Sequence, residues 1–126
     1  MPRFVILEHR YQGVHWDFML EADGSLRTWR LDRAPIADAA TVAAAALPDH
    51  RLAYLDYEGE VSGGRGTVSR LDRGEFEWIV DQPQSIEVKL AGRRFTGRAY
   101  LGADESGRWS FRLTSIEPDR GDSTVR

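Results

Sequence analysis

The sequence predicts a mainly β fold, namely a small antiparallel β-barrel with one or two short helical segments. Short apolar stretches with strand-like alternation recur along the chain at intervals of roughly 8 to 12 residues. Glycine, proline and aspartate turn signals separate these stretches. The chain has 126 residues, of which 41% are hydrophobic, and it contains four tryptophans, which is enough material for one packed core. We therefore expect a single domain over residues 1–126.

The N-terminal part is expected to hold three strands. Residues 4–8 are apolar and rich in β-formers, and residues 14–21 alternate between apolar and polar side chains. The dipeptide Asp23-Gly24 is a strong hairpin signal. Residues 26–31 should therefore return antiparallel to residues 14–21.

The middle of the chain is less regular. Residues 37–47 are rich in alanine with Asp38 near their start, so propensity predicts a short helix, which Pro48 ends. Residues 50–57 predict an extended segment. Residues 58–66 contain four glycines and predict a loop, which lacks the spacing and the terminal Lys-Ser/Thr of a phosphate-binding P-loop.

The remainder predicts an antiparallel meander followed by a tail. The expected strands are residues 67–71, 75–80, 85–90, 94–101 and 109–113. Turn signals lie between them, and Asp72-Arg73-Gly74 is expected to separate the first two. Residues 117–126 are polar and are expected to form a flexible tail.

Composition limits the kinds of function. The absence of cysteine excludes disulfides, thiolate metal sites and cysteine nucleophiles, and it is compatible with the reducing cytoplasm, where we expect the protein. No apolar run has membrane-spanning length, so no membrane partner is expected. The net charge of −3 is not that of a basic nucleic-acid-binding domain. Four basic residues near one expected hairpin could contact phosphates or form a solvated edge: Lys89, Arg93, Arg94 and Arg98.

One stretch carries a candidate site. In the alternating strand 14–21, His15 and Asp17 share the face opposite the apolar side chains, about 6 to 7 Å apart along the strand. His9 precedes a turn-prone Tyr11-Gln12-Gly13 and can swing over the same face. Two imidazoles and one carboxylate form a plausible divalent-metal site with open positions. The alternative is a surface hydrogen-bonded pair, and spacing alone leaves both interpretations open.

Several blocks of the sequence resemble the phosphoesterase domain of bacterial ligase D, the end-joining ligase, and its stand-alone relatives. They occur in family order between residues 4 and 113, and all three histidines of the chain fall on family histidine positions. The two histidine blocks are the most specific: His9-x5-His15-x-Asp17-Phe18-x-Leu20-Glu21 and Asp49-His50-x-Leu52-x-Tyr54-x-Asp56-Tyr57-Glu58-Gly59. Weaker marks are Gly66-Thr67-Val68, Asp72-Arg73-Gly74, Leu90-x-Gly92-x-Arg94 and Trp109-x-Phe111-x-Leu113.

The resemblance implies a β-barrel metalloenzyme that acts on the 3′ ends of DNA and RNA. Such enzymes remove a 3′-terminal ribonucleoside and then the 3′-phosphate, with manganese as the preferred metal. Position by position, the implied metal ligands are His9, His15 and Asp17. His50 and Tyr54 would contact the scissile phosphate or serve the leaving group. An end-joining ligase or a polymerase would be a natural partner.

The sequence departs from the family at positions that bind phosphate. Arg10, Gly13 and Met19 occupy an aspartate and two arginine positions of the first block, and methionine cannot clamp phosphate as arginine does. A second family basic pair falls on Thr41 and Val42. Arg33, which aligns with a family lysine, and Arg65, in the glycine-rich loop, are the expected phosphate-binding residues. Arg30 and Arg51 are further cations that could substitute.

Three functional hypotheses follow. The leading one is a metal-dependent phosphoesterase that processes nucleic-acid 3′ ends in DNA repair. The second is a diverged module that binds metal and nucleic-acid ends without efficient catalysis, and the methionine at position 19 motivates it. The third keeps the chemistry but changes the substrate to a small phosphoester, which would suit the acidic net charge.

Overall fold

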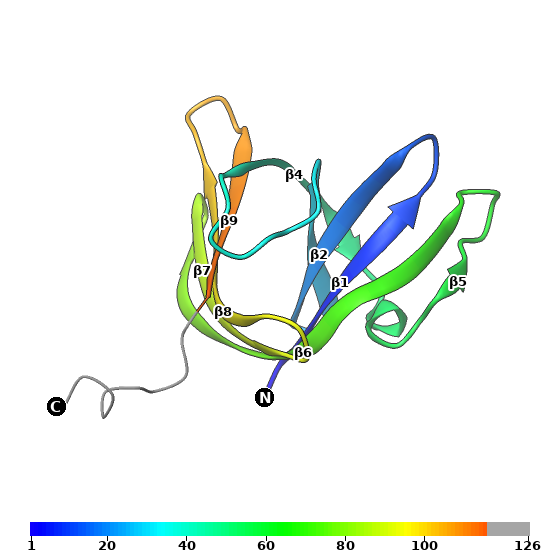
Figure 1. Ribbon diagram of the computed structural model, residues 1–126, viewed down its shortest axis with the longest axis horizontal. Coiled ribbons are helices and arrows are strands. Elements are labelled where there is room, and N and C mark those ends of the chain that lie inside the picture. Colours follow the sequence, from blue (N-terminus) through cyan, green and yellow to red (C-terminus); the bar gives the residue numbers. More distant parts are fainter. Residues whose placement is uncertain (116–126) are drawn as a thin grey trace, which may run out of the picture.

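The computed structural model describes residues 1–115, which form nine strands and one short 3-10 helix (Figure 1). The strands are β1 (Arg3–Arg10), β2 (Val14–Ala22), β3 (Ser25–Leu31), β4 (Val42–His50), β5 (Gly59–Glu60), β6 (Thr67–Gln82), β7 (Ser85–Gly92), β8 (Thr96–Ala103) and β9 (Trp109–Ser115). The helix η1 (Leu52–Leu55) lies between β4 and β5. The mainly β class is confirmed, while the predicted tail at 117–126 lies outside the described residues.

All nine strands belong to one antiparallel sheet that curves until β1, the first strand in the order, pairs with β6 near the other end. The strand order is β1-β2-β3-β4-β9-β8-β7-β6-β5, and β1 also pairs with β6. In Figure 1 the strands β7, β8 and β9 lie on one side of the molecule, and β1, β2 and β5 lie on the other. The antiparallel sheet is as predicted, and the more specific prediction of a barrel stays a prediction. Within the described residues, no helix has the length and apolar character needed to cross a membrane.

The predicted helix at residues 37–47 is wrong. Residues from Val42 onward form β4, which pairs with β3 on one side and with β9 on the other. Alanine favours a helix in isolation, but here the backbone hydrogen bonds and packing that β4 makes with β3 and β9 outweigh this propensity. Asp38 has φ +63° and accepts hydrogen bonds from the backbone and hydroxyl of Ser115, so it does not cap a helix.

Two further predictions of local structure are wrong. Residues 50–57 are not extended, because β4 ends at His50 and η1 follows. The strands predicted at 67–71 and 75–80 are one long strand, β6, and Asp72-Arg73-Gly74 lies inside it. At Gly74 β6 pairs with both β1 and β7, and a β-carbon there would lie 2.1 Å from the Ala91 carbonyl oxygen. This glycine allows a close approach of strands and does not mark a turn.

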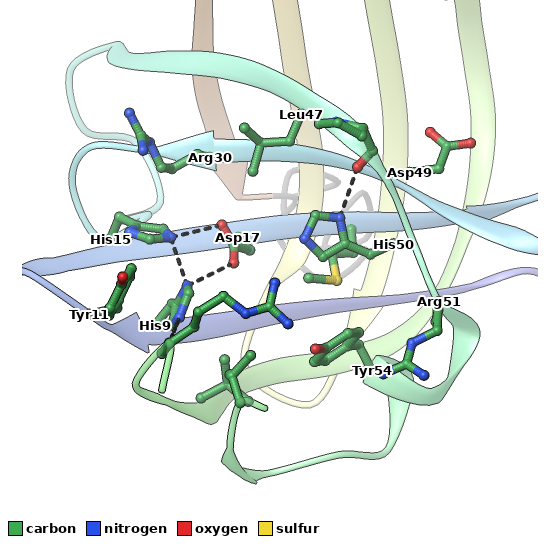
Figure 2. Close-up of a pocket in the computed structure, with 15 residues that line it drawn as sticks. His9, Tyr11, His15, Asp17, Arg30, Leu47, Asp49, His50, Arg51 and Tyr54 are labelled. Atoms are coloured by element: carbon green, nitrogen blue, oxygen red, sulfur yellow. Dashed lines mark hydrogen bonds and ion pairs between the residues drawn. The ribbon is translucent and has the colours of Figure 1, made fainter. Parts of the chain in front are cut away.

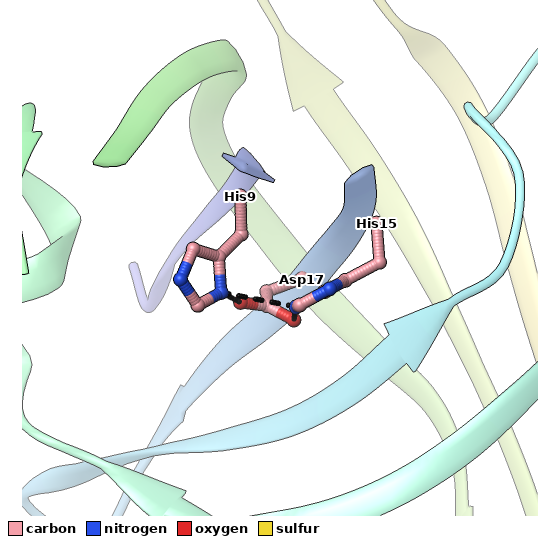
Figure 3. A group of neighbouring side chains, drawn as sticks. All are labelled: His9, His15 and Asp17. Carbon is pink, nitrogen blue, oxygen red and sulfur yellow. Dashed lines mark hydrogen bonds and ion pairs between the residues drawn. The ribbon is translucent and has the colours of Figure 1, made fainter. Parts of the chain in front are cut away.

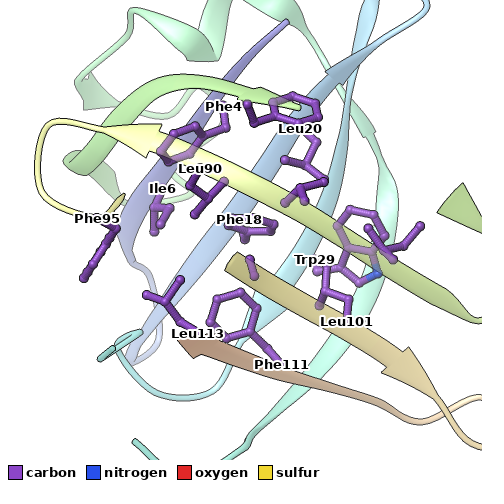
Figure 4. Close-up of a cluster of buried hydrophobic side chains, with 14 of the residues drawn as sticks. Phe4, Ile6, Phe18, Leu20, Trp29, Leu90, Phe95, Leu101, Phe111 and Leu113 are labelled. Atoms are coloured by element: carbon purple, nitrogen blue, oxygen red, sulfur yellow. The ribbon is translucent and has the colours of Figure 1, made fainter. Parts of the chain in front are cut away.

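Apolar side chains cover both faces of the β1–β2 hairpin. One face carries the larger core, to which Phe4, Ile6, Phe18 and Leu20 contribute (Figure 4). The other face carries a smaller cluster, in which Leu55 of η1 and Val61, directly after β5, join residues of β1, β2, β3 and β6. Its members are Val5, Leu7, Met19, Leu26, Leu55, Val61 and Val68. The hairpin therefore has a second packed face, and the polar residues of that face lie next to an apolar cluster.

Candidate functional site

Two histidines and one aspartate meet near the turn of the β1–β2 hairpin. His9 and His15 are directly opposite in the strand register, so both side chains lie on one face. The His9 Nδ1 and His15 Nε2 atoms are 3.0 Å apart. The Asp17 carboxylate lies between the rings, with Oδ2 3.7 Å from His9 Nδ1 and Oδ1 3.3 Å from His15 Nε2 (Figure 3). These three side chains could hold a metal ion.

The spacing of the three donors fits a metal ion. Nitrogen and oxygen ligands lie about 2.0–2.2 Å from a first-row divalent metal, so neighbouring donors of one ion are roughly 3.0–3.5 Å apart. Asp17 is 3% exposed, and its buried Oδ1 has no hydrogen-bond partner within residues 1–115. A buried carboxylate oxygen without a donor is unfavourable unless a proton or a cation compensates it. This donor set suits several divalent metals and does not choose among them.

The orientation of His9 is fixed from outside the group. Its Nε2 lies 2.7 Å from the backbone carbonyl oxygen of Arg65. Because a carbonyl oxygen only accepts, Nε2 carries the hydrogen and donates it. In the neutral ring the lone pair is then on Nδ1, which faces His15 and Asp17. A histidine that donates one N–H to a carbonyl while its other nitrogen faces a metal is a common arrangement in metal sites.

Gly66 explains how the Arg65 carbonyl reaches His9. The residue has φ +79°, and a β-carbon on it would lie 1.8 Å from the carbonyl oxygen of Arg10. Only glycine lets the chain pass this close to the end of β1. The loop is closed by a hydrogen bond from the Val61 backbone N–H to the Gly66 carbonyl, 2.8 Å long. The glycine-rich loop therefore packs its backbone against the histidine pair.

Burial changes the protonation of two of the three groups. It raises the pKa of Asp17 above its ordinary value, and the neighbouring histidines act in the opposite direction. It lowers the pKa of His15, which the charge of Asp17 partly counteracts. His15 is therefore held in its neutral form, which is the form that can bind a metal.

A cavity of about 530 Å³ joins this group to the second predicted pair, His50 and Tyr54 (Figure 2). His50 is the last residue of β4, and its Nδ1 lies 2.8 Å from the Pro48 carbonyl oxygen, so Nδ1 donates and Nε2 is free for other partners. The turn of η1 brings the Tyr54 ring to 5.9 Å from the His50 ring, with the two planes 65° apart. His50 is also close enough to Asp17 to act against the rise of that carboxyl's pKa.

The arginines of the region are placed differently from one another. Arg30, Arg51 and Arg65 line the cavity, whereas Arg33 is not among the lining residues. The Arg65 guanidinium donates from Nε to the Ser62 carbonyl oxygen at 2.8 Å. Met19 also lines the cavity and is 1% exposed.

Tyr11 is a lining residue that the sequence analysis did not single out. Its ring stacks on His9, with centroids 6.1 Å apart and planes 16° from parallel. It lies in the turn between β1 and β2, and it is 40% exposed. In the sequence, the signal for this residue was an aromatic side chain two positions after the candidate ligand His9.

The chain matches the family model of the DNA ligase D 3′-phosphoesterase domain over residues 7–102. It is 32% identical over 108 residues to the multifunctional non-homologous end joining protein LigD of Pseudomonas aeruginosa, covering 79% of this chain and 13% of that protein. It is 35% identical over 114 residues to the LigD DNA repair protein of Mycobacterium tuberculosis, covering 84% and 15%. With LigD of Mycolicibacterium smegmatis the identity is 29% over 122 residues, covering 85% and 16%.

The chain therefore spans less than a fifth of the length of these relatives. The family match covers the strand hairpin with His9, His15 and Asp17, and also the segment with His50 and Tyr54. On this match and these identities, the chain belongs to the DNA ligase D 3′-phosphoesterase domain family.

Proposed function

We propose that the protein is a manganese-dependent phosphoesterase that removes a phosphate or a ribonucleoside from the 3′ ends of DNA and RNA during repair. The observation that carries this proposal is the cavity itself, because it joins a three-donor metal group to a histidine and a tyrosine suited to phosphoryl chemistry. His9 Nδ1, His15 Nε2 and the Asp17 carboxylate would hold the ion. When bound, the metal polarises a phosphoryl oxygen and lowers the pKa of a water molecule.

His50 and Tyr54 are proposed to serve the phosphate and the leaving group. Hydrolysis joins a water oxygen to phosphorus and breaks the bond to the leaving oxygen. That oxygen is the 3′ oxygen when a terminal phosphate is released and the 5′ oxygen of the ribonucleoside when the diester is cut, and in both cases it must gain a proton. His50 can donate that proton from Nε2 when its ring carries both protons, because the Pro48 carbonyl keeps the other proton on Nδ1. The Tyr54 hydroxyl would donate a hydrogen bond to a phosphoryl oxygen, where negative charge builds up. Arg65 would add a cation at the wall of the cavity, and phosphate binding by Arg33 stays a prediction.

The apolar part of the cavity supports a nucleic-acid end over a small phosphoester. Met19, Leu47, Val61 and Val68 line the same cavity as the polar residues. Such a wall suits the sugar and the face of a base, while a small, strongly hydrated phosphoester would leave it uncovered. The product would be a 3′-hydroxyl, which is the end that a ligase or a polymerase uses.

One observation favours the alternative of a binding module without efficient catalysis. Met19 lies at the cavity wall, where it can donate no hydrogen bond to phosphate. A module of this kind would bind metal and nucleic-acid ends, with an affinity that falls as salt rises, but it would not turn substrate over.

The test uses primer–templates that end in a 3′-phosphate or in a single 3′-ribonucleoside, with Mn²⁺ and with a chelator. We expect metal-dependent release of phosphate and of nucleoside, and its loss in His9→Ala. In His50→Gln we expect a fall of about 100- to 10,000-fold with Mn²⁺ still bound, which is the usual range for a lost general acid. Mn²⁺ binding without turnover on either substrate would contradict the enzyme and support the binding module.

A further inference from the structure

Arg30 is a cation at the candidate site that the proposed mechanism leaves unused. It lies in β3 directly opposite Asp17 in the antiparallel register. Residues opposite each other in such a pair have β-carbons about 4.5–5.5 Å apart on the same face of the sheet. Arg30 also lines the cavity and is exposed. Figure 2 shows its side chain on the same side of the cavity as His15.

Within the described part of the chain, Arg30 has no ion pair and no side-chain hydrogen bond of its own. Arg65, in contrast, donates from Nε to the Ser62 carbonyl and, more distantly, from a terminal nitrogen to the Ser62 hydroxyl. Arg51 follows His50 on the other side of the cavity. The positive charge of Arg30 lies close enough to His15 and Asp17 to act toward a lower pKa of both groups. A free guanidinium beside this group is therefore available for an anion.

The charges of the site indicate which anion it should bind most tightly. A divalent ion and one carboxylate leave a single positive charge when both histidines are neutral, and Arg30 adds a second. A terminal phosphate monoester carries nearly two negative charges at neutral pH, whereas a phosphodiester carries one. Guanidinium also matches two phosphate oxygens at once in a bidentate fork. A monoester has free oxygens for both the ion and this fork.

We propose that the Arg30 guanidinium binds nonbridging oxygens of the substrate phosphate. It would thereby favour a terminal 3′-phosphate monoester over a 3′-ribonucleoside diester. This inference rests on the proposed phosphoesterase function, which it deepens. Arg30 acts from β3, one strand away from the ligands of β2, so its side chain can approach the phosphate from the side of the cavity opposite Tyr54.

The experiment compares Arg30→Gln and Arg30→Lys with the matched control Arg108→Gln. Arg108 is also exposed, lies between β8 and β9, and does not line the cavity. Three quantities are measured: Mn²⁺ affinity, the affinity of the Mn²⁺-loaded protein for inorganic phosphate by calorimetry, and kcat/KM on both primer–templates.

We expect Arg30→Gln to keep its Mn²⁺ affinity and to bind inorganic phosphate at least about 10-fold more weakly. Its kcat/KM should fall about 100-fold on the 3′-phosphate end and by less on the ribonucleoside end. Arg30→Lys should recover part of the loss, since it keeps the charge but not the planar fork. A merely structural role would move both substrates together.

The role of Arg30 would be overturned if Arg30→Gln matched Arg108→Gln in two measurements. These are the affinity for inorganic phosphate and the ratio of kcat/KM on the 3′-phosphate end to kcat/KM on the ribonucleoside end. If the unmodified protein turned over neither substrate, the phosphoesterase function would fail, and phosphate affinity alone would then decide on Arg30. Weaker phosphate binding in Arg30→Gln would still assign the anion to this residue, and unchanged binding would remove the assignment.

Discussion

Two buried aspartates, Asp17 and Asp72, have the same exposure of 3% and opposite surroundings. The Asp72 carboxylate accepts the backbone N–H of Arg94 at Oδ1 and that of Phe95 at Oδ2, both at 2.9 Å. Asp17 faces two imidazoles, and its Oδ1 has no hydrogen-bond partner in residues 1–115. Among the described residues, both oxygens of the Asp72 carboxylate accept a hydrogen bond, whereas Asp17 Oδ1 accepts none.

The surroundings of Asp72 are built to hold a turn. Its carboxylate ties the middle of β6 to the connection between β7 and β8. A β-carbon on Gly92 would lie 2.3 Å from Asp72 Oδ2, so the glycine is what allows the carboxylate to fit there. Both oxygens of this buried carboxylate accept a backbone N–H, which is the normal condition for a stable buried ion.

Hydrogen-bond partners, and not burial, therefore separate a structural carboxylate from a functional one. A buried acid without donors destabilises the fold unless something outside the protein compensates it. Groups of this kind gather at functional sites, because they are positioned for a ligand and not for the fold. The comparison predicts that mutations at the two positions affect different properties of the protein.

The largest expected effect is on metal binding in Asp17→Asn. An amide is a weaker ligand than a carboxylate and supplies no charge. Mn²⁺ affinity should fall by more than about 100-fold, since loss of a partner outside the coordination sphere alone costs about 10- to 100-fold. Release of 3′-phosphate should fall to background. Metal titration followed by electron paramagnetic resonance and the primer–template assay measure the two effects.

The same variant should leave the metal-free fold intact. Because the amide removes a buried charge that the protein does not satisfy, the unfolding temperature in chelator should be unchanged or higher. A variant that lost Mn²⁺ binding and also unfolded at lower temperature would show Asp17 to be a structural residue, against the comparison.

The next effect is on stability in Asp72→Ala. The substitution leaves the N–H groups of Arg94 and Phe95 without an acceptor, and each buried donor left unpaired costs about 1–3 kcal/mol. We expect the free energy of unfolding to fall by about 3 kcal/mol, measured by urea denaturation. Asp72→Asn keeps one acceptor oxygen and should lose less. Mn²⁺ affinity measured below the unfolding transition should match that of the unmodified protein, and a parallel loss of metal binding would break the separation.

Turn chemistry explains why much of the site could be predicted from the sequence. The turn after Arg10 sets His9 opposite His15, and the Asp23-Gly24 turn sets Asp17 opposite Arg30. Alternation then places the polar side chains on one face. The geometry of the His9–His15–Asp17 group therefore follows from spacing over a few residues, as does the mainly β class.

Long-range packing explains what could not be predicted. Residues 42–47 are helix formers by propensity, and only the partners β3 and β9 make them a strand. Asp72-Arg73-Gly74 has the composition of a turn, but it lies inside β6, where pairing with β1 continues and pairing with β7 begins at Gly74. The contact between the Arg65 carbonyl and His9 joins residues 56 positions apart. No local pattern encodes such a contact.

The smallest expected effect is a pH dependence of stability in the metal-free protein, and it tests the state of Asp17 directly. Burial raises the pKa of Asp17 above its ordinary value of 3.8, so the folded carboxyl keeps its proton where the unfolded chain has lost it. Stability should therefore fall as pH rises from about 3.8 through the raised pKa, and the penalty should then stay constant. Asn has no proton to lose, so the stability of Asp17→Asn relative to the unmodified protein should grow across the same window.

The burial of His15 acts in the other direction, and in Asp17→Asn the loss of the Asp17 charge lowers the pKa of His15 further. Because the pKa of His15 is lowered from 6.5, the folded state is penalised at low pH and the penalty is gone above that value, in both proteins. Urea unfolding in chelator over a pH series gives the difference in free energy. A difference that stayed flat or shrank with rising pH would mean that Asp17 is satisfied as a charge within the fold, as Asp72 is by its two backbone donors. Saturating Mn²⁺ should reverse the trend, because a metal binds the ionised carboxylate and stabilises the folded state more as the proton is lost.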